Sequence, residues 1–245
     1  MTKLDTVQLG GDRLRIGPWR GDPSVAYVAP APGRPAALAA VQECVDLLTA
    51  QGYERVLTAA LTRTERLPFD EAGFVEHERL RLLRHELYGL PPRPRRRLRR
   101  GRWRDQAAVL AVDQAAFDPF WRFDQHGLDE ARSATPIARY RVAVAGQRVA
   151  GYAISGRAGA ISYLQRLAVH PDHQGEGLGH ALVVDALTWA RRRGAASMLV
   201  NTQERNERAL ALYEQVGFRR EAHGLVVLSR SLVGAPDGLG PGGGT

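Results

Sequence analysis

The sequence predicts an α+β protein in which a mixed, mostly antiparallel sheet is flanked by helices. Three observations predict this fold class. Residues 138–169 hold three strand-like segments in succession, with short turns between them. Two segments with helical spacing, 178–193 and 206–216, then alternate with apolar strands. No apolar run reaches the ~20 residues that a membrane-spanning helix requires.

Composition bounds the class of protein. The chain has 245 residues, 44% of them hydrophobic, so it can bury a sizeable core. Residues 1–5 contain no apolar stretch typical of a signal peptide. Cys44 is the only cysteine, which excludes an internal disulfide and a cysteine-based zinc site. We therefore expect a cytoplasmic protein with no metal and no membrane association.

The net charge of the chain is concentrated in one segment. Residues 91–104 read PPRPRRRLRRGRWR and hold eight arginines and no acid. Without these eight, the Lys and Arg total falls from 34 to 26, which equals the number of Asp and Glu. We interpret 91–97 as an Arg/Pro-rich linker between an N-terminal domain, 1–90, and a C-terminal domain, 98–232. Residues 233–245 are rich in Gly and Pro and predict a disordered tail.

The C-terminal domain begins with a short strand near 98–101 and a helix at 106–117, whose apolar residues can share one face. Two strands joined at 145–147 follow, and His170-Pro171 ends a third strand at 160–169. The remaining expected elements are a helix at 178–193 closed by Gly194, a strand at 197–201, a helix at 206–216 closed by Gly217, and a last strand through about 218–228.

The N-terminal domain repeats the second half of this order. Its expected elements are a helix at 35–51 closed by Gly52, a strand at 55–61, and a long strand at 75–87. Residues 67–74 (LPFDEAGF) and 211–218 (ALYEQVGF) place an aromatic residue, an acid and Gly-Phe at the same spacing. We interpret the N-terminal domain as a duplicated unit that has lost its front half.

A glycine-rich turn connects the strand at 160–169 to the helix at 178–193. Its sequence, HQGEGLGH at 173–180, lets several backbone N–H groups converge at the positive end of the helix, an arrangement suited to phosphate oxygens. A dinucleotide-binding G-x-G-x-x-G would need a glycine at His180, and no Gly-Lys-Ser/Thr of a Walker A loop follows.

A second motif follows at 206–218, which reads NERALALYEQVGF. The combination of Q-x-x-G-x-G, helix, strand and N-x-x-A-x-x-L-Y-x-x-x-G-F closely resembles the GNAT family of acyl-CoA N-acyltransferases. The resemblance covers about residues 98–231. It implies the GNAT fold, preceded here by a truncated GNAT-like half. It also implies an acetyl-CoA-dependent N-acetyltransferase in which a primary amine attacks the thioester directly, without an acyl-enzyme.

The resemblance also implies roles for individual residues. Leu167, Ala168 and Val169 lie on a strand that splays from its neighbour and would offer backbone groups to the pantetheine arm and thioester. Asn206 would hydrogen-bond the pantetheine side, and Tyr213 would protonate the departing thiolate. The pyrophosphate would lie against the turn residues Gln174, Gly175, Glu176, Gly177, Leu178, Gly179 and His180.

The spacing of Asn206 and Tyr213 agrees with these roles. The two residues are seven positions apart, about two helical turns, so both can face one ligand. A phenol with a pKa of ~10 is a suitable acid for a thiolate of similar basicity. Without the family context, a tyrosine packed at a strand edge is the simpler interpretation of Tyr213.

Four aromatic residues lie within 117–123, the segment that borders the acceptor site in the family. Phe120 and Trp121 suggest an apolar acceptor pocket, edged by Asp118 and Asp124 and suited to a cationic amine. The alternative is that these residues cap the core beneath a loop.

The general base stays open. Protein N-terminal acetyltransferases, which the sequence partly resembles, have a glutamate five residues before the conserved Asn, and this chain has Asn201 there. Glu204, His126 and His223 are the weaker candidates, and a water relay would also serve.

The N-terminal copy lacks this chemistry. Thr62 and Phe69 stand at the positions of the Asn and Tyr of the site, and Phe69 has no proton to donate. The segment 30–35 (PAPGRP) offers too few N–H groups to hold phosphate. We expect a non-catalytic scaffold, in which Cys44 is a small buried helix residue.

Other classes of function stay open. The chain could be a non-catalytic acyl-CoA-binding sensor, or an RNA-associated module that uses the arginine-rich segment with Trp103. Within the enzyme class, the alternatives are a protein N-terminal acetyltransferase and a mycothiol-synthase-like enzyme, although the N-terminal half is short for the latter. The expected partner is a small-molecule or peptide amine. Nucleic acid is disfavoured, and a homodimer is compatible with the sequence.

Overall fold

The computed structural model describes residues 4–31, 35–92 and 94–233. The chain divides into two compact units, Met1–Arg79 with Leu225–Thr245, and Leu80–Gly224. We call them the N-terminal unit and the C-terminal unit. This division differs from the boundary predicted at 91–97, because it falls within a strand and places the last strand of the chain in the N-terminal unit. The predicted tail lies, from residue 234 onward, outside the described residues.

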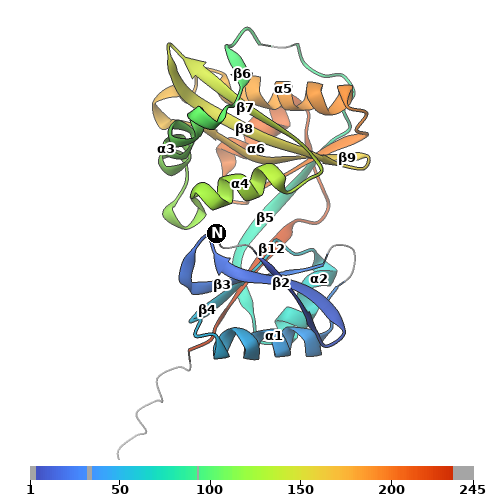
Figure 1. The fold of residues 1–245 in the computed structure, drawn as a ribbon. Helices are drawn as coiled ribbons and strands as arrows, with labels where there is room; N and C mark the ends of the chain where they lie inside the picture. The colour runs from blue at the N-terminus through green and yellow to red at the C-terminus, as the bar shows by residue number, and fades with distance from the viewer. Residues whose placement is uncertain (1–3, 32–34, 93, 234–245) are drawn as a thin grey trace, which may run out of the picture. The chain divides into compact units, whose positions relative to one another are not determined.

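The N-terminal unit is a sheet with two helices (Figure 1). Its strands lie in the order β1-β2-β3-β4-β12. Strands β3 and β4 are parallel, and the other neighbours are antiparallel. The bounds are β1 Asp5–Leu9, β2 Asp12–Trp19, β3 Asp22–Pro30, α1 Leu38–Ala50, β4 Arg55–Thr58, α2 Arg63–Glu71 and β12 Leu225–Ser231.

Strands β1 to β3 correct the expectation that this unit has lost its whole front half. Only alternate residues of β2, such as Leu14 and Ile16, are buried, and the strand contains Gly17-Pro18, where its pairing with β3 shifts register. The glycine and proline interrupt the strand signal in the sequence. The helix expected at 35–51 and the strand expected at 55–61 are confirmed as α1 and β4.

The C-terminal unit has the fold expected from the sequence. Its strands lie in the order β5-β10-β9-β8-β7-β6, with residues 80–85 of β5 at one end. Strands β9 and β10 are parallel, and their other neighbours are antiparallel. The bounds are β5 Val75–His85, β6 Leu98–Arg100, α3 Gln106–Ala116, α4 Gln125–Ser133, β7 Ile137–Ala145, β8 Arg148–Ala158, β9 Ile161–Val169, α5 Leu178–Arg192, β10 Ser197–Gln203, α6 Glu207–Val216 and β11 Arg219–Arg220.

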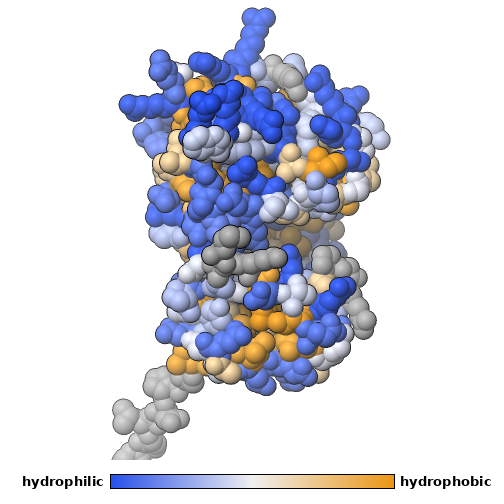
Figure 2. Space-filling model, viewed as in Figure 1, coloured by the Kyte–Doolittle hydropathy of each residue, from blue (hydrophilic) through white to orange (hydrophobic). Residues whose placement is uncertain are grey.

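Apolar clusters line both faces of this sheet. On one face, α5 and α6 pack with Leu164 and Met198 of the strands. On the other face, α3 and α4 pack with Tyr152 and Ile154. Figure 1 shows α3 and α4 in green, apart from the orange α5. The visible face of this unit is mainly hydrophilic in Figure 2, as expected when the apolar side chains are used in two cores.

The last predicted strand, 218–228, is broken into two. β11 pairs with β5, and after Gly224 the chain continues as β12, which pairs with β4. At Gly224 a Cβ would lie 2.3 Å from the Leu80 carbonyl oxygen, so the close approach requires glycine. The exchange of final strands is reciprocal, because β5 follows α2 and yet pairs with β10. Each unit therefore takes its final strand from the other half of the sequence.

Candidate active site

The parallel strands β9 and β10 separate within the C-terminal unit. They pair from Ile161 with Ser197 to Tyr163 with Leu199. Beyond this point β9 continues along β8 to Val169, whereas β10 continues along β5 to Gln203. The splay expected from the sequence is therefore present. Leu167, Ala168 and Val169 lie on its β9 side, beyond the last residue of β9 that pairs with β10.

A turn with left-handed glycines leads from β9 into α5. Gly175 has φ +83° and Gly177 has φ +77°, backbone conformations that residues other than glycine rarely adopt. Gly177 is the N-cap of α5 and, as a glycine, gives the helix no side-chain cap. The first N–H groups of a helix have no partner within the helix, so this end is suited to an anion. Of the residues expected at this site, 174–177 form the turn and 178–180 are the first residues of α5.

Polar side chains surround this turn. The Gln174 amide donates from Nε2 to the Val169 carbonyl oxygen at 3.1 Å, and its Oε1 accepts a hydrogen bond from Arg208 of α6. Gln174 therefore connects the end of β9 to α6. Arg96, from the segment predicted to be a linker, places Nε and Nη2 3.7 Å from the position that a Gly177 Cβ would occupy. Sequence reasoning treated the arginine run as one charged segment and did not assign Arg96 to the turn.

Helix α6 positions Asn206 and Tyr213. Asn206 is the N-cap residue, and its Oδ1 accepts a hydrogen bond from the Ala209 N–H at 3.1 Å. Tyr213 is 5% exposed, and its ring centroid lies 5.6 Å from that of Phe218. Burial raises the pKa of the Tyr213 phenol, and the nearby Arg166 cation opposes this rise. Tyr213 therefore keeps its proton at neutral pH.

The segment between α3 and α4 contains the residues expected to border the acceptor. Phe120 and Trp121 are partly exposed and pack edge to face with ring centroids 5.0 Å apart. Both expected carboxylates have partners within the chain. Asp124 caps α4 by accepting from the Gly127 N–H at 2.7 Å, and Asp118 lies 3.4 Å from Arg205.

The candidates for a general base lie in different surroundings. Glu204 follows β10 and pairs with Arg81 at 3.0 Å. His126 is half-buried on α4, and His223 is exposed near the end of the C-terminal unit. Asn201, the position at which the N-terminal acetyltransferases carry glutamate, is exposed on β10.

A buried ionic cluster was missed by sequence reasoning. Asp113 of α3 is fully buried and pairs with Arg166 of β9, with Nη2 and Oδ2 2.8 Å apart. The Tyr152 hydroxyl donates a hydrogen bond to the same carboxylate. The available signal was the polarity of the two residues, because each interrupts an otherwise apolar face of its element.

In the N-terminal unit, the start of α1 corresponds to the start of α5. This helix end is covered by residues of the same unit. The Ala37 N–H at the start of α1 donates to Asp12 Oδ2 at 2.7 Å. A Cβ on Gly10 would lie 2.7 Å from the Ala40 backbone N, so the β1–β2 turn lies directly against α1. A carboxylate and a turn therefore lie at the start of α1, whereas Gly177 gives the start of α5 no side-chain cap. Cys44 is buried on α1, and burial raises its pKa to about 12, which disfavours a nucleophilic thiolate.

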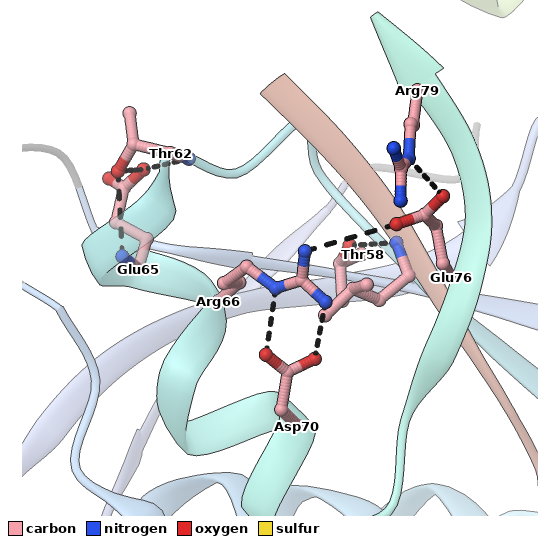
Figure 3. Close-up of polar contacts among 8 residues, drawn as sticks. Thr58, Thr62, Glu65, Arg66, Asp70, Glu76 and Arg79 are labelled. Atoms are coloured by element: carbon pink, nitrogen blue, oxygen red, sulfur yellow. Dashed lines mark hydrogen bonds and ion pairs between the residues drawn. The ribbon is translucent and has the colours of Figure 1, made fainter. Parts of the chain in front are cut away.

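Helix α2 carries the counterparts of Asn206 and Tyr213. Thr62 and Glu65 form a reciprocal capping box at its start, which Figure 3 shows beside the Arg66–Asp70 ion pair. Phe69 is fully buried, and its ring meets that of Phe74 at 5.2 Å. The segment 30–35 is described only in part, since residues 32–34 lie outside the described residues.

Two further features of the described residues concern metals and membranes. Within 4–31, 35–92 and 94–233, no three His, Cys, Asp or Glu side chains are grouped so that they could hold a metal ion. No helix in the same ranges has the length and apolar character needed to cross a bilayer.

Comparison with known sequences gives one match over most of the chain and others over shorter segments. Residues 103–218 match the acetyltransferase (GNAT) family. Mycothiol acetyltransferase from Geodermatophilus obscurus is 32% identical over 217 residues, which cover 72% of this chain and 70% of that protein. Ribosomal protein bS18-alanine N-acetyltransferase from Escherichia coli (strain K12) is 40% identical over 55 residues, which cover 22% of this chain and 37% of that protein.

Comparison with solved structures extends the likeness over both units. A tandem GNAT protein from the clavulanic acid biosynthesis pathway matches with a TM-score of 0.65 at 17% identity, covering 93% of this chain and 82% of that one. A GCN5-related N-acetyltransferase from Kribbella flavida matches with a TM-score of 0.63 at 15% identity, covering 93% of this chain and 89% of that one. At these identities the likeness is one of fold.

Proposed function

Because the chain belongs to the acetyltransferase (GNAT) family, we propose that its C-terminal unit transfers an acetyl group from acetyl-CoA to a primary amine. One observation carries the proposal. The uncapped, glycine-lined start of α5 lies at the end of β9, where β9 has separated from β10. A glycine-lined helix N-terminus thus occurs beside a strand that has left its neighbour, and this arrangement suits a coenzyme with a pyrophosphate and an amide-containing arm.

The residues of the chain fit this coenzyme group by group. Backbone N–H groups of 174–179 hold the pyrophosphate, and Arg96 adds a positive charge beside Gly177. Backbone groups of Leu167, Ala168 and Val169 bind the pantetheine arm. The Asn206 side chain hydrogen-bonds the same arm, because its Oδ1 caps α6 and its amide nitrogen remains a donor.

Acetyl-CoA supplies a thioester that a neutral amine can attack directly. Tyr213, which is protonated at neutral pH, then gives its phenolic proton to the leaving sulfur. No covalent enzyme intermediate is involved, and Cys44 takes no part. A water relay, or one of Glu204, His126 and His223, removes the proton from the amine.

We propose a small-molecule amine as acceptor. Phe120 and Trp121 provide an apolar border, and Asp124 adds negative charge at its edge even while it caps α4. The name of the Geodermatophilus relative, which aligns over most of both chains, points to a small-molecule acceptor. A peptide amine is the alternative, supported by the local match to the bS18 enzyme. Asn201, in place of a glutamate, weakens that alternative.

We also propose that the enzyme is cytoplasmic. The proposed reaction is compatible with either a monomer or a homodimer.

A second candidate function rests on the arginine-rich segment. Trp103 is 80% exposed and follows the edge strand β6, among arginines that outnumber nearby acids. Exposed aromatic and cationic side chains together suit single-stranded RNA. A salt-dependent affinity for RNA, lost in Trp103→Ala, would support an RNA-associated module. A non-catalytic acyl-CoA sensor would instead bind acetyl-CoA without any turnover.

Thiol release from acetyl-CoA tests the enzymatic proposal. The acceptors are phenethylamine, spermidine, aminoglycosides and short peptides, each measured with and without protein. We expect turnover with at least one amine and none with the corresponding alcohols. Micromolar binding of acetyl-CoA without turnover for any amine would favour the sensor, and absence of binding would overturn the proposal.

A further inference from the structure

Arg166 lies where β9 changes its pairing with β8. Ser155 pairs with Leu164, but the preceding residue, Ile154, pairs with Arg166, so Gln165 is an extra residue in β9. This bulge turns Arg166 onto the face that carries α3 and α4. Its side chain is 10% exposed, and it immediately precedes the three residues proposed to bind the pantetheine arm.

The guanidinium group is held by hydrogen bonds and by contacts with two aromatic rings. Its Nε and Nη2 donate to the two oxygens of Asp113, each at 2.8 Å. The guanidinium carbon lies 3.5 Å from the ring centroid of Phe117 and 3.9 Å from that of Phe123. Nη2 also donates to the Trp121 carbonyl oxygen at 2.7 Å. One side chain thus contacts the start, middle and end of 117–123, which we call the acceptor loop.

Asp113 strengthens the same connection. It is fully buried and, besides Arg166, accepts from the Phe123 N–H at 2.6 Å and from the Tyr152 hydroxyl. The carboxylate therefore joins the acceptor loop to α3 and β8 at one point. The arginine guanidinium makes two parallel hydrogen bonds and two ring contacts, so it restricts the loop to one geometry. A flexible lysine ammonium would restrict the loop less.

The acceptor loop extends to the mouth of the splay. Asp118 lies 3.4 Å from Arg205, the residue before Asn206, on the connection from β10 to α6. Arg166 is also close enough to act on the Tyr213 phenol through its charge. The acceptor loop and β9 therefore meet at one guanidinium group, whose charge also acts on the Tyr213 phenol.

We propose that Arg166 is a positioning residue that fixes the acceptor loop against β9, so that recognition of the amine depends on it while recognition of the coenzyme does not. This inference rests on the proposed acetyl transfer. It assigns Arg166 to the specificity of that reaction through Phe120 and Trp121, which the guanidinium group holds by way of the loop backbone.

Arg166→Lys tests the proposal, because lysine keeps the charge and loses the fork. The matched control is Arg139→Lys. Arg139 makes a similar two-bond pair with Asp185 of α5, at 2.9 and 3.1 Å. Hydrogen–deuterium exchange of the folded variants reports the loop without any need for activity.

We expect exchange in 117–124 to become about tenfold faster in Arg166→Lys, while 174–180 is unchanged. Arg139→Lys should leave 117–124 as in the parent protein. Acetyl-CoA affinity by calorimetry should stay within about threefold in both variants. With phenethylamine as acceptor, KM for the amine should rise by roughly tenfold in Arg166→Lys, with kcat and KM for acetyl-CoA nearly constant.

Unchanged loop exchange in folded Arg166→Lys would overturn the proposal, as would a parallel loss of coenzyme affinity. If Arg166→Lys does not fold, Phe123→Leu removes one ring contact and should shift loop exchange in the same direction. Failure of the parent protein to bind or turn over acetyl-CoA would refute the proposed function separately. The exchange comparison would still decide whether Arg166 holds the loop.

Discussion

The two units share the order strand, strand, strand, helix, strand, helix. The N-terminus of the first of these helices, however, has different groups beside it in each unit. In the N-terminal unit, Asp12 accepts the Ala37 N–H and the turn at Gly10 covers α1. In the C-terminal unit, α5 begins at Gly177, which gives no side-chain cap, and the Arg96 guanidinium group lies 3.7 Å from the position of a Gly177 Cβ. One helix end is already neutralised by a carboxylate of the chain, and the other is left electropositive for a ligand.

The second helices of this order, α2 and α6, also differ in whether their polar groups have partners within the unit. Both begin with a side-chain cap, from Thr62 in α2 and Asn206 in α6, and both carry an aromatic ring at the eighth position of the motif. Glu65 completes a capping box in α2, so the polar groups there satisfy each other. Asn206 keeps a free donor. In α2 the polar groups have partners within the unit, whereas in α6 the proposed site leaves the Asn206 amide for the ligand, and the packing of the two helices is similar.

Replacement of Tyr213 by phenylalanine gives the largest expected effect. Tyr213→Phe preserves the ring contact with Phe218 and removes only the proton, so kcat should fall by about 10²–10⁴ with little change in acetyl-CoA affinity. The measurement is steady-state thiol release beside a binding isotherm. Retention of more than about a third of the parent kcat would remove Tyr213 from the mechanism and make it resemble its counterpart Phe69.

Truncation of Phe69 tests the other side of the comparison. The ring is fully buried against Phe74, so Phe69→Ala should cost about 3–5 kcal/mol of unfolding free energy. Because the N-terminal unit has no expected role in chemistry, kcat and acetyl-CoA affinity of the folded protein should not change. Chemical denaturation and thiol release are the two assays. Lost turnover at unchanged stability would show that this unit is more than a scaffold.

A carboxylate at Gly177 should convert the open helix end into a closed one. In Gly177→Asp the new charge lies at the α5 N-terminus, as Asp12 lies at that of α1, and acetyl-CoA affinity should fall by about a hundredfold or more. Gly194→Asp is the control, since Gly194 has φ +74° but lies at the other end of α5. Equal coenzyme affinity in the two variants would contradict the assigned turn.

The smallest expected effects come from the two helix caps. Thr62→Ala and Asn206→Ala each remove a side-chain cap, so each should lower stability by about 1 kcal/mol. Only Asn206→Ala should also weaken acetyl-CoA binding. Thermal unfolding with and without acetyl-CoA separates the two contributions, because the stability that bound coenzyme adds rises with the logarithm of its affinity. The same ligand-induced shift in both variants would mean that Asn206 only caps the helix.

Much of the C-terminal unit could be predicted from local pattern. The turn at 173–180 and the motif at 206–218 combine glycine positions with helical spacing, and both fold as expected. The strand at 160–169 and the hairpin before it were also correct, because alternating apolar residues and a short turn define them. These features depend on residues close together in the sequence.

The missed features depend on distant residues. Arg166 and Asp113 are 53 positions apart, and no local rule pairs a charge on an apolar strand with one on an apolar helix. Arg96 could not be separated from its neighbours in a run of arginines. The splitting of the last strand was missed because β12 finds its partner, β4, some 170 residues earlier, as the Leu228 N–H bond to Thr58 shows.

The reciprocal exchange of β5 and β12 has a consequence for fragments of this protein. A cut in the arginine-rich segment would separate the chain into two pieces, neither of which contains all the strands of one unit. The first piece would carry the strand that completes the C-terminal sheet, and the second would carry the strand that completes the N-terminal sheet. The pieces would behave as a split protein, whose parts regain their sheets only through complementation.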